Sequence, residues 1–475
     1  MKDSREFQSL QGNFCARAWE GMAATTGKSK TNFSRFALAF SVNHACVVSV
    51  LAIAVVLLQK QGAYQAAALY IAYALSALFL STPILNKLGP KKTLTVAAAL
   101  YCLYVLSFPA ALLATSSAER LVIALLGGVG GGVAAGNLWA AQGTYFSLSA
   151  KLFARESGVH VEEATNVLAA RFAAIFLGTE LLLKLLPLFI AFLVDRVDKP
   201  SSSSTGLSSD QIIISIVYSV CAIVSAMAIS YIDDLGLDVS SDENVEPAGP
   251  TDERTSGLLA KVAKGQNSSY NAGLMDKIAS AIGLWRRRPE VLLLAPVQIL
   301  FSFCASLLGV KVSGEILPQL FINNEIIVGS LLSALVSFTA AAFQFPFKVT
   351  SSRFGKSPVM VSGMIAFCCL GLIVFCGAAG SMAPFVICYV LQGVGRACYE
   401  GVNKALYADL FPEDAPAAFS NIVLANGLAS AFAYFAMPSM NLVSSSSLVL
   451  SSGALSLLCY FFLLAKCKRT QKEEE

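Results

Sequence analysis

The stretch Lys87-Leu88-Gly89-Pro90-Lys91 separates two long apolar segments, and Arg353-Phe354-Gly355-Lys356-Ser357 separates two others. A second pair of echoes follows, because Gly128-Val129-Gly130 in the first half of the chain returns as Gly393-Val394-Gly395 in the second. Both pairs lie about 265 residues apart, so the two halves share one register. Duplicated apolar segments at one fixed spacing are typical of secondary transporters built from two similar halves.

The composition places these segments in a membrane. The chain has 56% apolar residues, 13% charged residues and a mean hydropathy of +0.65, whereas a soluble domain carries roughly 25% charged residues. The apolar segments are about 20 residues long, enough for a helix to cross a hydrocarbon core of about 30 Å. We therefore predict an all-α polytopic protein with twelve membrane helices in two pseudo-symmetric halves of six. The predicted spans are 34–58, 64–85, 93–114, 120–142, 166–194 and 211–232, then 290–312, 326–348, 358–379, 383–404, 417–438 and 446–465.

Lysine and arginine are concentrated beside one side of these spans. That side has the loops after spans two and eight, the triplet Arg286–Arg288 and the basic ends of the chain. Because basic residues favour the cytosolic side, we expect both termini in the cytosol. The choice between plasma membrane and endomembrane stays open. The net charge of +4 follows from this topology and predicts no nucleic-acid partner. The predicted divisions are a tail over 1–32, a six-helix half over 33–232, a cytosolic linker over 233–288, a second half over 289–465 and a tail over 466–475.

The linker changes character along its length. Its first part is acidic, poor in aromatic residues and contains Pro247 and Pro250, a composition typical of disorder. In the segment 273–285, apolar residues recur at helical spacing beside the basic triplet. We predict an amphipathic helix on the inner membrane surface. A helix that binds a partner protein is the alternative.

The motifs of common enzymes are missing from the sequence. It has no nucleophile elbow, no phosphate-binding lysine loop and no zinc-protease motif, and its two histidines are few for acid–base or zinc chemistry. The twelve cysteines show no C-x-x-C spacing and mostly lie in the predicted spans, where we interpret them as packing residues. We predict a protein that is not an enzyme and has no cofactor and no bound metal.

Glycine is concentrated in the fourth predicted span, where six glycines fall between residues 127 and 136. Small residues allow membrane helices to approach closely. We predict close helix packing there, with a flexing gate helix as the alternative.

Several polar side chains fall near the middle of the predicted spans. Inserting a charged group at the membrane centre costs about 2.5–3.5 kcal/mol, so charged residues there indicate a structural or functional role. These residues form the candidate site for a substrate or a coupling ion. They are Asn43 and His44 in span one, Glu180 in span five, Gln298 in span seven, Arg396 and Glu400 in span ten, and Asn426 in span eleven.

Two pairs have the i,i+4 spacing that puts both side chains on one helix face, namely Glu180 with Lys184 and Arg396 with Glu400. One interpretation is a structural ion pair that anchors each helix. The other is a transport site in which a carboxylate binds a proton or cation and Arg396 balances a substrate charge. His44 has the same two interpretations, packing or titration, and the sequence leaves both open.

The basic loops after spans two and eight resemble the loop of the major facilitator superfamily, whose pattern is G-x-x-x-D-R/K-x-G-R-R/K. The basic residue and the glycine are present in both copies, while Asn86 and Ser352 stand where the family has an acid. The resemblance implies two six-helix halves and loops that control opening toward the cytosol. The gating residues it implies are Lys87, Gly89, Lys91, Lys92, Arg353, Gly355 and Lys356.

A narrower resemblance lies at the end of span four. Trp139, Gln142, Gly143 and Tyr145 have the spacing of the W-x-x-Q-G-x-Y signature, so the chain is similar to the Unc-ninety-three-like branch, the ion-channel-regulatory proteins of this superfamily. Members of that branch usually carry an acid after the second glycine of span ten, where this chain has Arg396. Anchoring at the membrane interface is the alternative role for the aromatic members of this motif.

Two functions are therefore open. The first is a carrier that moves a small solute or ion by alternating access, with proton coupling as one option. The second, implied by the Unc-type resemblance, is a non-transporting membrane partner that regulates or escorts an ion channel or receptor. Such a partner would use its lipid-facing surfaces and the segment 273–285. Because a pure escort does not need polar groups at the membrane midplane, we favour the carrier.

Overall fold

The computed structural model describes residues 28–197, 209–235, 283–321, 324–376, 382–411 and 414–474, and within these ranges the regular structure is helical throughout. The first half consists of α2 (Lys28–Leu58), α3 (Lys60–Phe79), α4 (Ser81–Leu113), α5 (Ser117–Ser157), α6 (Val161–Val197) and α7 (Ser209–Ser230). The second half consists of α10 (Glu290–Leu307), η1 (Leu308–Ile316), α11 (Leu317–Leu320), α12 (Glu325–Phe354), α13 (Lys356–Phe375), α14 (Met382–Cys398), η2 (Tyr399–Asn403), α15 (Lys404–Leu410), α16 (Ala415–Ala436), η3 (Met437–Ser439) and α17 (Leu442–Glu474).

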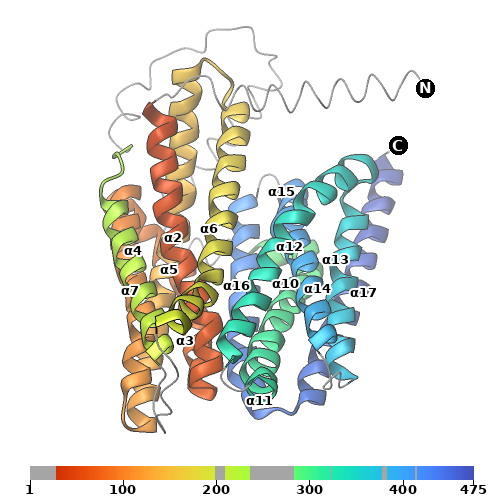
Figure 1. Cartoon of the computed structure of the whole chain (residues 1–475). Coiled ribbons are helices and arrows are strands. Elements are labelled where there is room, and N and C mark those ends of the chain that lie inside the picture. The colour runs from red at the N-terminus through yellow and green to blue at the C-terminus, as the bar shows by residue number, and fades with distance from the viewer. Residues whose placement is uncertain are drawn as a thin grey trace, which may run out of the picture.

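Among the described residues, eleven helices are long and apolar enough to cross a membrane. A twelfth crossing is supplied by α14, η2 and α15, which follow one another without a break from Met382 to Leu410. Eleven of the predicted spans each overlap one of these twelve helical segments, and the span predicted over 64–85 covers most of α3 and the start of α4. The predicted fold class is confirmed. The two groups of helices stand beside each other (Figure 1), and each is built around a buried apolar cluster to which the other group adds a few residues.

The two echoed loops have the same backbone geometry. Gly89 has φ 74° and ψ 168° inside α4, and Gly355 between α12 and α13 has φ 80° and ψ 176°. Pro90 follows the first glycine and starts the next helical turn, where its fixed φ is suitable and its missing N–H costs nothing. The expected loop after span two is therefore a sharp break between two helical segments.

Glycines of α5 bring that helix into backbone contact with α3. A Cβ added at Gly128 would lie 2.4 Å from the carbonyl oxygen of Gln65, and one at Gly132 would lie 2.3 Å from that of Leu69. Only a residue without a side chain fits at such distances. The close packing predicted for the fourth span is therefore present, and it holds α3 and α5 together as one unit.

The halves meet along three seams, where α2 contacts η1, α3 contacts α16 and α6 contacts α12, and α2 also contacts α12. At the first seam, a Cβ added at Gly314 would lie 2.8 Å from Cγ1 of Val55. At the second, the rings of Tyr70 and Tyr434 stack with centroids 5.7 Å apart. The third seam contains the charged residues described below.

Two segments of the second half have π-helical winding. These are η1 and η2, which interrupt the crossings that begin with α10 and α14. Single π-helical turns occur often at functional sites, because the extra residue leaves backbone groups and side chains out of the α-helical register. The segment η2 contains Glu400, one of the predicted site residues.

The linker lies largely outside the described residues, and so does most of the predicted amphipathic helix over 273–285. The described part begins at residue 283, with a single helical turn over 283–287.

Candidate functional site

An arginine of the second half binds a glutamate of the first half. The Nη1 atom of Arg396 on α14 donates to Oε1 of Glu180 on α6 at 2.7 Å, and Nη2 donates to Oε2 at 2.9 Å. The planar guanidinium matches a carboxylate in this two-bond arrangement. Glu180 is only 1% exposed, so the pair is buried at the level of the membrane spans.

Two further side chains bind the same carboxylate. Lys184 Nζ lies 2.8 Å from Oε1 of Glu180, one helical turn away on α6. Ser337 on α12 donates its hydroxyl to that oxygen at 2.9 Å and accepts a bond from Lys184 at 3.0 Å. We call Glu180, Lys184, Ser337, Arg396 and Glu400 the charge cluster. Its two carboxylates and two cations balance.

Glu400 has a different environment from Glu180. Its Oε1 accepts a bond of 2.7 Å from Nε of Arg396, and its side chain is 31% exposed, compared with 2% for Glu180. Both pairs with i,i+4 spacing are therefore formed, and Arg396 joins them across the two halves. Of the two carboxylates, Glu400 is the more exposed.

His44 lies in an aromatic wall beside these charges. Its ring stacks on Phe176 with centroids 5.3 Å apart, and Trp139 contacts its edge at 5.1 Å. The hydroxyl of Tyr101 lies 3.5 Å from Nδ1. His44 also interacts electrostatically with the four charged members of the cluster. We use the name aromatic wall for Phe40, His44, Trp139, Phe172 and Phe176, whose rings contact one another.

Two of the predicted amides bond within their own halves. Asn43 on α2 donates to the carbonyl of Ala222 on α7 at 3.1 Å. Gln298 on α10 exchanges two hydrogen bonds of 3.2 Å with Asn403 in η2. Both Asn43 and Gln298 are fully buried, and these bonds tie neighbouring helices of one half together.

Asn426 on α16 bonds to the residue that precedes Glu400. Its side chain donates to the hydroxyl of Tyr399 at 3.1 Å, and the ring of Tyr399 stacks on Phe301 at 3.8 Å. Sequence reasoning missed Asn403 and Ser337. The position of Asn403, three residues after Glu400, is a signal that could have found it, since both fall in one predicted span.

Comparison with known proteins agrees with this architecture. The family model of the Major Facilitator Superfamily matches residues 265–475. The structure of the nucleoside transporter NupG is similar, with a TM-score of 0.59 and 10% identity over 92% of this chain and 99% of that one. The xylose transporter XylE from E. coli has a TM-score of 0.59 and 14% identity, over 92% of this chain and 96% of that one. The protein is a multi-pass membrane protein with the major facilitator fold.

A curated relative gives a weaker match. A stretch of 126 residues is 30% identical to an uncharacterized transporter of Buchnera aphidicola subsp. Schizaphis graminum (strain Sg), covering 25% of this chain. The chain spans about a third of the length of that relative, 31%. The family model describes the superfamily as a whole, so the Unc-ninety-three-like branch stays a prediction.

The loops after spans two and eight contain the expected gating residues. Here Lys356 binds the carboxylate of Asp409 and donates to the carbonyl of Ala405 at 3.1 Å, both on α15. Lys87 and Lys92 of the first copy are exposed. Control of opening by these loops stays a prediction.

The residues of the Unc-type motif separate into different environments. Trp139 belongs to the aromatic wall and is half-buried. Tyr145 is fully buried, accepts a bond from Asn32 at 2.8 Å and donates to the carbonyl of Asp233 at 2.9 Å. Gln142 is half-buried, and Gly143 is exposed. Within this major facilitator fold, Tyr145 fixes the end of the first half to α2.

The described end of the linker docks on the second half. Trp285 donates to Asn421 at 2.6 Å, and Arg287 binds Asp414 at 3.0 Å. Arg288 donates to the carbonyl of Leu410 at 2.8 Å. The basic triplet therefore contacts the ends of α15 and α16. In the part of the chain that the structure describes, no group of three or more potential metal ligands occurs.

Proposed function

We propose that this protein is a transporter that moves a small solute by alternating access and uses the charge cluster as its coupling site. The observation that carries the proposal is the buried two-bond ion pair between Arg396 and Glu180, which belong to different halves. In alternating access the halves rock against each other around a midplane site. A charged contact between the halves must therefore break or rearrange in every transport cycle.

Separating this pair without compensation is costly. Removing one partner of a buried ion pair typically costs about 3–5 kcal/mol, because the remaining charge has no partner. A protein that must move between two states needs something to offset that cost. A proton on a carboxylate, or a charged group of the solute, supplies it.

Glu400 is the better candidate for the proton. Glu180 is buried and accepts bonds from Arg396, Lys184 and Ser337. Glu400 is partly exposed and accepts a bond from Arg396. A proton on Glu400 leaves the cluster with one net positive charge. A solute with an anionic group then restores the balance, so binding of proton and solute favour each other.

The aromatic wall supports a solute with an apolar or planar part. Its rings lie beside the charges, and aromatic faces with a few convergent polar groups are typical of small-molecule sites. The similar structures are transporters of nucleosides, xylose and peptides. These classes, together with small carboxylates, form the first set of solutes to test.

The test is uptake into liposomes that contain the purified protein, with and without an imposed pH gradient. We expect a pH gradient to drive uptake of one class of solute, and Glu400→Gln to abolish the effect of the gradient. Glu163→Gln, at the exposed start of α6 in the first half, is the control and should transport normally. Unchanged gradient-driven uptake by a correctly folded Glu400→Gln protein would end the proposed role.

The Unc-type regulator remains the alternative. The segment 273–285 would provide its partner-binding surface, and Trp285 at the end of that segment is bonded within the chain. A pull-down of a channel or receptor complex, carried out with the full chain and with residues 273–282 deleted, tests the regulator hypothesis. A complex lost on deletion, together with absent uptake for all solutes, would favour the regulator.

A further inference from the structure

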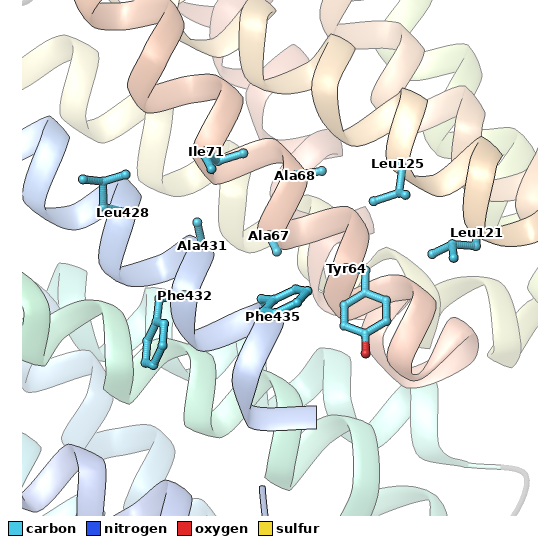
Figure 2. A pocket seen from close by; sticks show the side chains of 10 residues that line it. All are labelled: Tyr64, Ala67, Ala68, Ile71, Leu121, Leu125, Leu428, Ala431, Phe432 and Phe435. Carbon is cyan, nitrogen blue, oxygen red and sulfur yellow. The ribbon is translucent and has the colours of Figure 1, made fainter. Parts of the chain in front are cut away.

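An apolar groove opens on the membrane-facing side of the seam between α3, α5 and α16 (Figure 2). Its volume is about 630 Å³, within the range of ligand sites. Its lining side chains are aliphatic or aromatic, and the Tyr64 hydroxyl is the one polar group among them. At the rim, Phe435 is 66% exposed and Phe432 is 53% exposed, so both face the surroundings of the bundle.

The groove lies across the two halves. The helices α3 and α5 belong to the first half and α16 to the second. The rings of Tyr64 and Phe435 approach to 5.7 Å across the groove, and Tyr70 stacks on Tyr434 along the same seam. Any occupant would therefore contact both halves.

Polarity changes along the groove. One end, at Tyr64 and Leu121, lies close to the turn before α3 and the start of α5, where the exposed side chains of Gln61 and Ser117 bond at 3.1 Å. The other end, at Ile71, is apolar. From Tyr64 to Ile71 the helix rises about 10 Å, less than one leaflet's share of a core of about 30 Å. An amphiphile with a polar head and an apolar chain matches this gradient.

We propose that this groove binds the acyl chain of a membrane lipid, with the lipid headgroup at the level of Gln61 and Ser117. The surroundings of a membrane-facing groove at this depth are lipid chains. Leaving the groove empty would forfeit the dispersion contacts of its walls. The bound chain fills the seam between the halves, and the site does not depend on the transport role of the charge cluster.

The test uses the full chain in lipid nanodiscs that contain phosphatidylcholine with a photoreactive diazirine in one acyl chain. After illumination, mass spectrometry locates the labelled residues. We expect labelling within 64–71, 121–125 and 428–435 to exceed that at Leu182 and Phe345, which are membrane-facing and similarly exposed, at 70% and 65%.

A double substitution fills the groove from its rim. Leu125→Trp with Leu428→Trp should lower groove labelling to the level at Leu182. The matched control, Leu126→Trp with Phe419→Trp, changes exposed residues of the same two helices outside the groove and should leave labelling unchanged. Labelling of the unsubstituted groove no stronger than that at Leu182 would overturn the proposal, whether or not the variants fold. A different apolar molecule that co-purifies at one per chain would overturn the assignment to lipid.

Discussion

Gly355 has a backbone conformation that almost only glycine adopts, with φ 80° and ψ 176°. In this region of φ and ψ, a residue with a side chain is less stable than glycine by about 1–3 kcal/mol. A Cβ added there would meet nothing within 4 Å, so the cost comes from the backbone alone. We predict that Gly355→Ala lowers the stability of the protein by about that amount in thermal unfolding. Gly143→Ala is the control, since its Cβ also meets nothing. Gly143 lies inside α5, so alanine should be neutral or slightly stabilising there. Equal effects of the two substitutions would contradict the argument.

The two carboxylates of the charge cluster should differ in their contribution to stability. Glu180→Gln leaves Arg396 and Lys184 buried with less compensation, so we expect a loss of about 3 kcal/mol. Glu400→Gln removes one bond at a partly exposed position, and a loss of about 1 kcal/mol or less is expected. Chemical denaturation of both variants in the same detergent measures the difference. A Glu400→Gln protein less stable than Glu180→Gln would show that the burial of Glu180 is not what makes it important.

The charged residues of this cluster could be predicted from the sequence more easily than the bonds between the two halves. The i,i+4 spacing within α6 and along α14 and η2 indicated both local pairs, because helical geometry fixes which side chains share a face. The bond between Arg396 and Glu180 joins positions far apart in the chain and depends on how the halves pack. Ser337 escaped notice for the same reason, since a serine in an apolar span gives no signal of its own.

At the scale of elements, the glycines of α5 set the distance between helices. We predict that Gly128→Leu prevents normal folding or costs at least about 3 kcal/mol, because the side chain would be driven into the backbone of α3. Gly130→Leu is the matched control, since a Cβ there would lie 3.6 Å from the flexible side chain of Leu103. Size-exclusion profiles and thermal unfolding of the two proteins make the comparison. Similar behaviour of both would mean that α5 can move away from α3 at little cost.

Element ends were harder to predict than element positions. Hydropathy identified each crossing, since about 20 apolar residues are what a helix needs in a bilayer. It could not show that α5 continues to Ser157, well beyond the predicted end at residue 142. That extension carries polar residues, and contacts outside the hydrocarbon layer stabilise it. One of these is the bond of 2.5 Å from Ser29 to Glu156.

At the scale of the whole molecule, the two halves pack against each other at the end where η1 meets α2. Gly314 in η1 packs against Val55 of α2 and so holds the halves together at that end. We predict that Gly314→Leu separates them there and closes the opposite end. Hydrogen–deuterium exchange should rise near Val55 and fall at the opposite end, near Gly89 and Gly355. Gly178→Leu, whose Cβ meets nothing within 4 Å, is the control and should change neither region. A rise in exchange at both ends would indicate loosening instead of rocking.

Rewinding of the π-helical segment η2 would change the partners within the charge cluster without any movement of the halves. If its extra residue were absorbed and the segment wound as an α-helix, the residues after it would turn by about 100° relative to those before it. Arg396 lies before the segment and Glu400 within it, so such a turn would rotate the Glu400 carboxylate away from the guanidinium. The bonds between Arg396 and Glu180 would remain. We therefore expect neutralisation of Glu400 to be accompanied by rewinding of η2. A structure at low pH that retained both the π winding and the bond to Arg396 would exclude this local switch.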